Sequence, residues 1–322
     1  MATPVPGTIL TNPNQTQDIG SYYVSVTAVR NLGYEQATPQ MRARGLLNDM
    51  GTSEEAYAIP MGPISIGNTV IFKDGDRPGA GKPQLTKVSG LCQKRGITPL
   101  RLFEADRMAN RIPITTPNIM ARGRSERLME DEQYSRALEA GTDAAKQASY
   151  DGKAYFATDH YFDPVAQTGA QSNLLTKLPL TPDNLGKAKT TVRKWKAENG
   201  QPLFAGFVPE WLLEVPPNLE KTAQKICTRD HVAEGGASVE NIEMGTRYFV
   251  NSFLTNDTTW FLHIINAMMP TCYRVVFRPM VRRDKDASSE LFKDTGAIEI
   301  FADEWTDYRL FCWPLALMAQ AS

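Results

Sequence analysis

Two proline-marked helix starts, separated by one short apolar run, constrain this chain more than any other feature. At the first start Thr181 can accept a hydrogen bond from a free amide, Pro182 needs no N–H donor, and Asp183 complements the helix dipole. Apolar residues then recur at i, i+3, i+7 and i+10 and predict one buried stripe: Leu185, Ala188, Val192 and Trp195. Gly200 favours a left-handed stop, so we predict that this helix continues to residues 198–200.

The residues after this helix predict a strand and then a second helix. The apolar run Trp211–Val215 has the length of a strand, and Pro216 and Pro217 forbid it from continuing. Leu219, Ala223 and Ile226 mark the buried side of the helix that follows. Residues 180–226 are therefore predicted to form a helix, strand, helix layer.

Length and charge set wide limits on function. With 322 residues and 42% hydrophobic content the chain can bury a sizeable core. Its formal net charge of -1 gives no global electrostatic case for a nucleic acid or a membrane surface as ligand. No window approaches the roughly 20 apolar residues of a membrane span, and residues 1–20 lack the regions of a signal peptide. We expect the chain to be made and used in a cytoplasm.

The sequence predicts no catalytic residue, no cofactor and no metal ligand. The four cysteines form no paired spacing and are expected to pack as small buried hydrophobes: Cys92, Cys227, Cys272 and Cys312. Asp159 and His160 together resemble part of a hydrolase site, but no nucleophile motif accompanies them. The chain is therefore predicted not to be an enzyme.

Two charged clusters have alternative interpretations. Asp284, Asp286, Ser288 and Glu290 alternate like a calcium loop but lack its glycine and distal glutamate, so we interpret them as a solvated turn. Arg122, Arg124 and Arg127 form a basic cluster that either touches DNA or marks a solvated helix start.

Residues 1–56 are polar, rich in Pro, Gly, Asn, Gln and Thr, and show no sustained helical stripe. We predict an N-terminal arm whose apolar anchors, Tyr22 and Tyr23, clamp a neighbouring subunit. The alternative is that the arm wraps its own domain. Residues 1–20 carry one charged side chain, Asp18, and several prolines, so we expect no long charged helix here.

Residues 59–91 predict a long hairpin with a tip rich in glycine and proline. A two-stranded ribbon needs a surface to lie on, so we expect the tip to contact a neighbouring subunit through Lys73, Asp74, Asp76, Arg77 and Lys82. A phosphate-binding loop is the alternative, but no Ser or Thr follows the glycine and lysine, and Pro83 blocks a helix start.

Helix formers from residue 127 to 149 predict a long amphipathic helix, with acidic residues early and Lys146 late. The last third reads mostly as strand, in β-branched or aromatic runs that span residues 248–253, 260–265, 273–277, 297–301 and 308–318. These elements predict an α+β fold.

The order of elements across residues 150–226 resembles the major head (capsid) proteins of Mu-like bacteriophages. The resemblance implies an α+β fold of the Hong Kong 97 capsid type, with an N-terminal arm, an extended hairpin loop, a long spine helix, and peripheral and axial domains. On this basis residues 1–56 are the arm, 57–100 the extended loop, 101–179 the peripheral domain with the spine helix, 180–272 the axial domain, and 273–322 the return to the peripheral domain.

The resemblance also implies a function and partners. The chain would self-assemble, as hexamers and pentamers, into the icosahedral head of a tailed double-stranded DNA phage, with the DNA on its inner face. It would assemble in the bacterial host cytoplasm, end in the virion, meet a separate scaffold protein and a portal, and touch no membrane. The alternatives are an encapsulin-like compartment shell and a soluble α+β enzyme.

Overall fold

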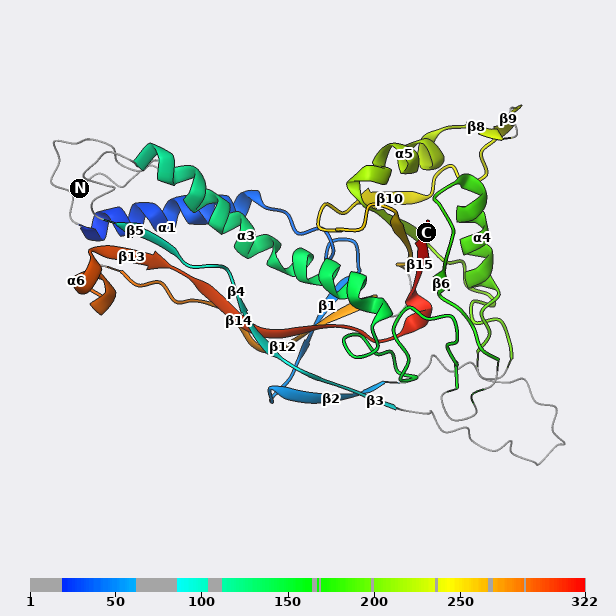
Figure 1. Ribbon diagram of the computed structural model, residues 1–322, viewed down its shortest axis with the longest axis horizontal. Helices are drawn as coiled ribbons and strands as arrows, with labels where there is room; N and C mark the ends of the chain where they lie inside the picture. The colour runs from blue at the N-terminus through cyan, green and yellow to red at the C-terminus, as the bar shows by residue number, and fades with distance from the viewer. Residues whose placement is uncertain are drawn as a thin grey trace.

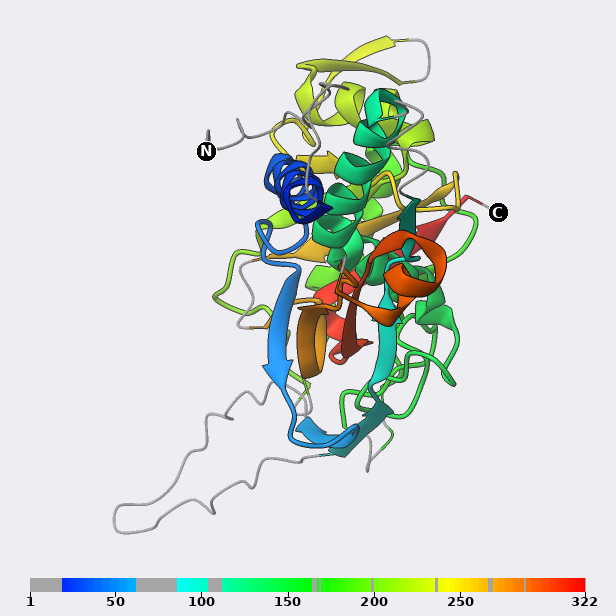
Figure 2. The same ribbon diagram turned by 90° about the vertical axis from the view of Figure 1, so that its left-hand side faces the viewer.

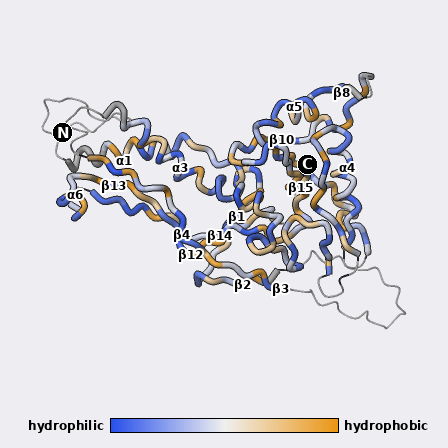
Figure 3. Tube along the Cα trace, viewed as in Figure 1, coloured by the Kyte–Doolittle hydropathy of each residue, from blue (hydrophilic) through white to orange (hydrophobic). Residues whose placement is uncertain are grey.

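A computed structural model describes residues 19–61, 86–103, 112–163, 167, 169–197, 200–234, 237–265, 269–286 and 288–321. The molecule is elongated, with a narrow arm of two helices over strands at one end and a broader body at the other (Figure 1). Hydrophilic residues are interspersed with apolar ones along α3 (Ile112–Glu139), the long helix that joins the two parts, as expected for a helix with one buried face (Figure 3).

The arm contains two long helices, α1 (Ile19–Gln36) and α3 (Ile112–Glu139), which lie side by side (Figure 2). Beneath them a four-stranded sheet has the order β1 (Leu47–Gly51), β12 (Cys272–Arg282), β14 (Ala302–Leu310), β4 (Gln93–Gly96). At the far end β5 (Leu100–Phe103) pairs with β13 (Ala297–Ile300), and α6 (Glu290–Thr295) precedes β13. A small apolar cluster fills this end: Val26, Val29, Leu102, Ile119, Ile298 and Ile300.

The expectation that the N-terminal segment lacks a helix is wrong, because α1 forms within it. Val26, Val29, Arg30 and Gly33 recur at i, i+3, i+4 and i+7, and they form the face that meets the rest of the arm. Two of these four residues are a charge and a glycine, so a search for apolar periodicity does not detect the stripe.

The spine helix is displaced from its predicted range, since α3 begins at Ile112 and ends at Glu139 instead of residue 149. A short 3-10 turn (Ala140–Thr142) follows it. The carbonyl of Gly141 accepts a hydrogen bond from the Phe156 amide at 2.8 Å, and the Gln147 side chain donates to the Tyr308 carbonyl at 2.8 Å. Tertiary hydrogen bonds thus replace helical ones where propensity alone favours a longer helix.

The body is built on a five-stranded sheet of order β10 (Arg247–Val250), β7 (Trp211–Val215), β11 (Thr259–Ile264), β15 (Ala316–Gln320), β6 (Leu174–Leu175). The strand Trp211–Val215 confirms its prediction, and β11 is buried along its whole length. A 3-10 turn (Trp313–Leu315) divides the predicted run 308–318 between β14 and β15.

Two helices pack against this sheet, α4 (Pro182–Arg193) and α5 (Glu220–Thr228), the second after a 3-10 turn (Pro217–Leu219). Thr181 caps α4 through the Asn184 amide at 3.2 Å. Leu185, Ala188 and Val192 of the predicted stripe are buried on α4, and Trp195 is buried just beyond its end. However, α4 ends at Arg193, and Gly200 stops no helix. Its positive φ of 78° serves a tight turn in which the Ala197 amide donates to the Gln201 carbonyl.

Two hairpins extend from this framework, β2 (Ala56–Met61) with β3 (Thr86–Leu91), and β8 (His231–Glu234) with β9 (Ala237–Glu240). The pairing of β2 with β3 confirms the base of the predicted hairpin. Its tip, with Lys73, Asp74, Asp76, Arg77 and Lys82, lies outside the described residues.

Candidate functional site

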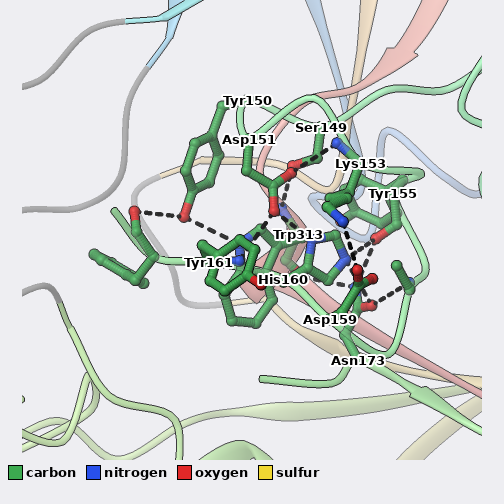
Figure 4. A network of polar contacts seen from close by, with 12 residues as sticks. Ser149, Tyr150, Asp151, Lys153, Tyr155, Asp159, His160, Tyr161, Asn173 and Trp313 are labelled. Carbon is green, nitrogen blue, oxygen red and sulfur yellow. Dashed lines mark hydrogen bonds and ion pairs between the residues drawn. The ribbon is translucent and has the colours of Figure 1, made fainter. Parts of the chain in front are cut away.

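A network of polar contacts surrounds His160 in the segment that precedes α4 (Figure 4). The His160 ring stacks on Trp313 with centroids 4.7 Å apart and planes 5° apart. Its Nδ1 lies 2.8 Å from the Asp151 carboxylate, and both side chains are wholly buried. Its Nε2 lies 3.1 Å from both the Tyr155 carbonyl and the Asn173 side-chain oxygen. Every polar atom of the ring is therefore occupied.

Asn173 and Ser149 join this network to the C-terminal segment. The Asn173 amide donates to the carbonyls of Tyr155, Trp313 and Ala316 at 2.8 to 3.2 Å, and the Ser149 hydroxyl donates to the Phe311 carbonyl at 2.9 Å. These bonds satisfy the backbone of a loop-rich segment that has little regular structure of its own. The network therefore stabilises the fold at this point.

The arrangement does not form a hydrolase site. Asp159, the sequence neighbour of His160, points away to Lys153, 2.5 Å from its Nζ, and this ion pair lowers the pKa of Asp159. All four cysteines are buried, which confirms their predicted packing, and burial raises the pKa of Cys312 to about 12. Within the described ranges no three side chains of His, Cys, Asp or Glu are placed to hold a metal ion.

A second buried network lies where α3 meets the sheet of the body. The Glu214 carboxylate, wholly buried in β7, lies 2.8 Å from His263 Nε2 of β11. It also accepts hydrogen bonds from Tyr134 of α3 at 3.2 Å and from Asn251 at 2.6 Å. Burial and the Glu214 charge raise the pKa of Tyr134, so its hydroxyl remains a donor. The sequence analysis did not identify the pair of Glu214 and His263. The usable signal was that each is a polar residue within an otherwise apolar strand.

A third network ties the arm together. Arg30 of α1 is fully buried and forms ion pairs with Glu126 of α3 and with both oxygens of Asp284, the latter at 2.7 Å. Arg282 also donates to Glu126, at 3.2 Å. Asp284 was predicted to lie in a solvated turn, and that interpretation is wrong for this residue because its carboxylate faces the buried guanidinium. Asp286 bonds the amide and hydroxyl of Ser288, as in a turn.

The structure places other candidate residues as follows. Tyr22 and Tyr23 lie on α1, but their side chains fall outside the described residues. Arg124 donates to Gln36 at 2.8 Å, and Arg127 stacks on Tyr34 at 5.0 Å, so these two cations bind α1.

Exposed apolar residues lie in two loops at one end of the body's sheet. Strands β7 and β10 are parallel neighbours, so the loops that precede them emerge at the same end. Phe207 and Val208 lie in one loop, and Ile242 and Met244 lie in the other; Val208 is 82% exposed and Ile242 is 87% exposed. We call these four residues the loop patch. Exposed apolar side chains that gather in this way are typical of protein contact surfaces.

None of the helices within the described part of the chain is long and apolar enough to cross a membrane. No protein-family model matches the chain, and no curated protein matches it in sequence.

Solved structures give the informative comparisons. The chain is similar to the capsid protein of the cyanophage P-SCSP1u, with a TM-score of 0.56 and 8% identity over 89% of each chain. It is similar to the procapsid protein of bacteriophage JBD30, with a TM-score of 0.50 and 12% identity over 94% of this chain and 75% of that one. It is also similar to the capsid protein of a native GTA particle, with a TM-score of 0.50 and 6% identity over 88% and 93% of the two chains.

At such identities these similarities show a shared fold. The fold is a mixed helix and sheet fold similar to that of Hong Kong 97-type phage capsid proteins, as predicted at this level. The finer resemblance to Mu-like head proteins stays a prediction.

Proposed function

We propose that this chain is the major capsid protein of a tailed double-stranded DNA phage or prophage and that it assembles with copies of itself into an icosahedral head. The observation that carries the proposal is the fold similarity to a phage capsid protein over 89% of both chains. The networks around His160 and Glu214 support it, because their polar side chains bond one another and leave no evident nucleophile or oxyanion site.

The elongated shape also supports a structural role. A narrow arm and two projecting hairpins offer much surface for neighbouring copies, and the loop patch supplies apolar contact area (Figure 1). We assign residues 1–56 to the N-terminal arm, a smaller unit than the narrow two-helix arm of the molecule, 57–100 to the extended loop, 101–179 and 273–322 to the peripheral domain, and 180–272 to the axial domain. Helix α1 then belongs to the arm segment and packs on its own subunit, so the clamp on a neighbour is assigned to the residues before and at Tyr22 and Tyr23.

The remaining partners follow from the proposed role. Hexamers and pentamers of the chain enclose DNA, a separate scaffold protein guides assembly, and a portal occupies one vertex. The hairpin tip, with Lys73, Asp74, Asp76, Arg77 and Lys82, contacts the adjacent copy. The complete particle is the virion head, formed in the bacterial host cytoplasm.

Size and nucleic-acid content test this function together. Purified protein is passed over a size-exclusion column, and the high-mass fraction is treated with nuclease before its nucleic acid is extracted. A head protein elutes as capsomers or particles, and particles from infected or induced cells protect double-stranded DNA. Particles that hold a protein cargo without DNA would indicate a compartment shell, and a small discrete oligomer would indicate a soluble enzyme; either result contradicts the proposal.

A further inference from the structure

The hairpin of β2 and β3 is a separate two-stranded ribbon that joins neither larger sheet among the described residues. It lies at the foot of the molecule, away from the two long helices (Figure 2). An isolated ribbon of two strands is only marginally stable in water. Its orientation therefore depends on the few side chains that anchor its base to the body.

Tyr57 on β2 is the main anchor, and a glycine opposite makes room for it. Tyr57 and Gly90 are direct partners in the ladder between β2 and β3. A Cβ at position 90 would lie 2.4 Å from the Tyr57 hydroxyl oxygen and 2.9 Å from an Asp307 carboxylate oxygen. Only glycine therefore lets the phenol cross its partner strand and reach β14.

The hydroxyl of Tyr57 ends in a charged pair on β14. It donates to Asp307 Oδ2 at 2.7 Å, and Arg309 Nε donates to the same oxygen at 2.8 Å and to the phenol oxygen at 3.2 Å. The Tyr308 amide donates to the other Asp307 oxygen at 3.0 Å. Tyr57 is 6% exposed, and the three polar groups satisfy one another at the edge of the core. We call Tyr57, Asp307 and Arg309 the hairpin clamp.

Apolar contacts surround this clamp. Val88 of β3 and Cys92 are buried in the same core cluster as Tyr57. The Cys92 amide donates to the Glu55 carbonyl at 2.8 Å, and its thiol lies 3.7 Å from the Val275 carbonyl of β12. These contacts hold the ribbon against the sheet, while the clamp supplies the directional bonds, because hydrogen bonds depend on angle and apolar contacts do not.

We propose that the hairpin clamp fixes the direction in which the β2–β3 ribbon leaves the subunit, and thereby the angle at which the ribbon meets a second copy of this chain. The inference rests on the proposed function for its second half only. Tyr57 is a positioning residue, since it acts through the ribbon and makes no contact of its own with the neighbour.

The test compares Tyr57→Phe with Tyr150→Phe. The control removes another buried hydroxyl, which accepts from Trp313 Nε1 at 3.0 Å and lies 3.3 Å from the Phe162 carbonyl, far from the ribbon in sequence. Hydrogen exchange on unassembled subunits reports the ribbon, and electron micrographs report the diameters of assembled shells. We expect amides of β2 and β3 to exchange at least about fivefold faster in Tyr57→Phe and not in Tyr150→Phe. The reason is that Tyr57→Phe removes the ribbon's hydrogen bond to Asp307, which keeps only its bond from Arg309 at that oxygen.

Assembled Tyr57→Phe protein should give a broader range of diameters or open shells, whereas Tyr150→Phe should give the wild-type diameter. Gly90→Ala should reproduce the Tyr57→Phe result because the added methyl displaces the phenol, and Gly51→Ala, where nothing lies within 4 Å of the new Cβ, serves as its control. Equal exchange rates in the two tyrosine variants, or equal diameters, would overturn the inference.

The two hypotheses fail separately. A wild-type protein that never forms shells contradicts the proposed function, while hydrogen exchange on the same subunits still decides whether the clamp orders the ribbon. Wild-type shells together with Tyr57→Phe shells of unchanged diameter contradict the clamp and leave the proposed function standing.

Discussion

The backbone of Arg30 on α1 lies directly against Gly123 on α3, and a Cβ at position 123 would fall 1.9 Å from the Arg30 carbonyl oxygen. The approach is reciprocal, because a Cβ at Gly33 would fall 2.1 Å from the Met120 carbonyl oxygen. Two glycines thus set how closely the helices of the arm pack, and this close approach brings the Arg30 side chain to Glu126 one turn along α3.

Gly123→Ala should destabilise the subunit. Helix propensity favours alanine by about 1 kcal/mol, but overpacking typically costs about 1 to 3 kcal/mol and the obstruction here is backbone, which cannot rotate away. The difference between the two is a net loss in the free energy of unfolding of up to about 2 kcal/mol, measured by urea unfolding of the subunit. Gly51→Ala is the matched control, and a Gly123→Ala subunit more stable than wild type would contradict the close packing.

Arg30→Met should lower the free energy of unfolding more than the loss of an exposed ion pair does. The change leaves the carboxylates of Glu126 and Asp284 buried without their shared cation, and breaking a buried pair costs about 3 to 5 kcal/mol. Arg136→Ala removes an exposed i,i+4 pair with Glu132 and should cost about 0.3 to 0.5 kcal/mol. Equal losses of unfolding free energy in the two variants would show that the buried network stabilises the subunit no more than an exposed ion pair does.

Acid should loosen the strands of the arm in a defined window. Hydrogen bonds from Arg101 and Lys285 lower the pKa of Glu299. Burial raises the pKa of Asp303, but hydrogen bonds from Lys94 and Arg283 outweigh burial, so the pKa of Asp303 is also lowered. A carboxyl whose folded pKa lies below its unfolded value adds stability that is complete above the ordinary pKa of about 4 and is lost as pH falls through the folded value. The double variant Glu299→Gln, Asp303→Asn should therefore show a flatter loss of stability below about pH 4 than wild type. Identical slopes in urea unfolding across this range would refute the assignment.

Ile242→Asp should spare folding and impair assembly. Ile242 is 87% exposed, so its replacement removes little buried area, and exposed substitutions usually change stability by less than about 0.5 kcal/mol. A charge within the loop patch should nevertheless oppose contact between copies, because it must lose its water there. Particle yield by sedimentation measures the effect, and Ile242→Val should assemble normally. Normal yield from Ile242→Asp would exclude the loop patch from the contacts.

Elements whose buried face is purely apolar were predicted from the sequence, and elements whose buried face includes charged residues or glycine were not. The stripe of α4 and the strand Trp211–Val215 were correctly predicted because apolar residues alone define their buried faces. The face of α1 includes Arg30 and Gly33, whose burial makes sense only against α3, so local periodicity did not identify it.

The same reason explains the polar networks. Arg30, Glu126 and Asp284 come from three distant segments, and each residue alone looks like an ordinary surface charge. The hairpin clamp was equally hidden, because the bond from Tyr57 to Asp307 exists only once the ribbon and β14 are placed together. Pairings between distant segments follow from the tertiary fold, which a single sequence does not encode as a local pattern.

The most direct measurement is a cryo-electron microscopy reconstruction of the particles that the purified chain forms. We predict a closed icosahedral shell of hexamers and pentamers, with each subunit's N-terminal arm and β2–β3 ribbon in contact with its neighbours. Protein that stays as small oligomers under every assembly condition, or a closed shell whose subunits do not fit this fold, would contradict it.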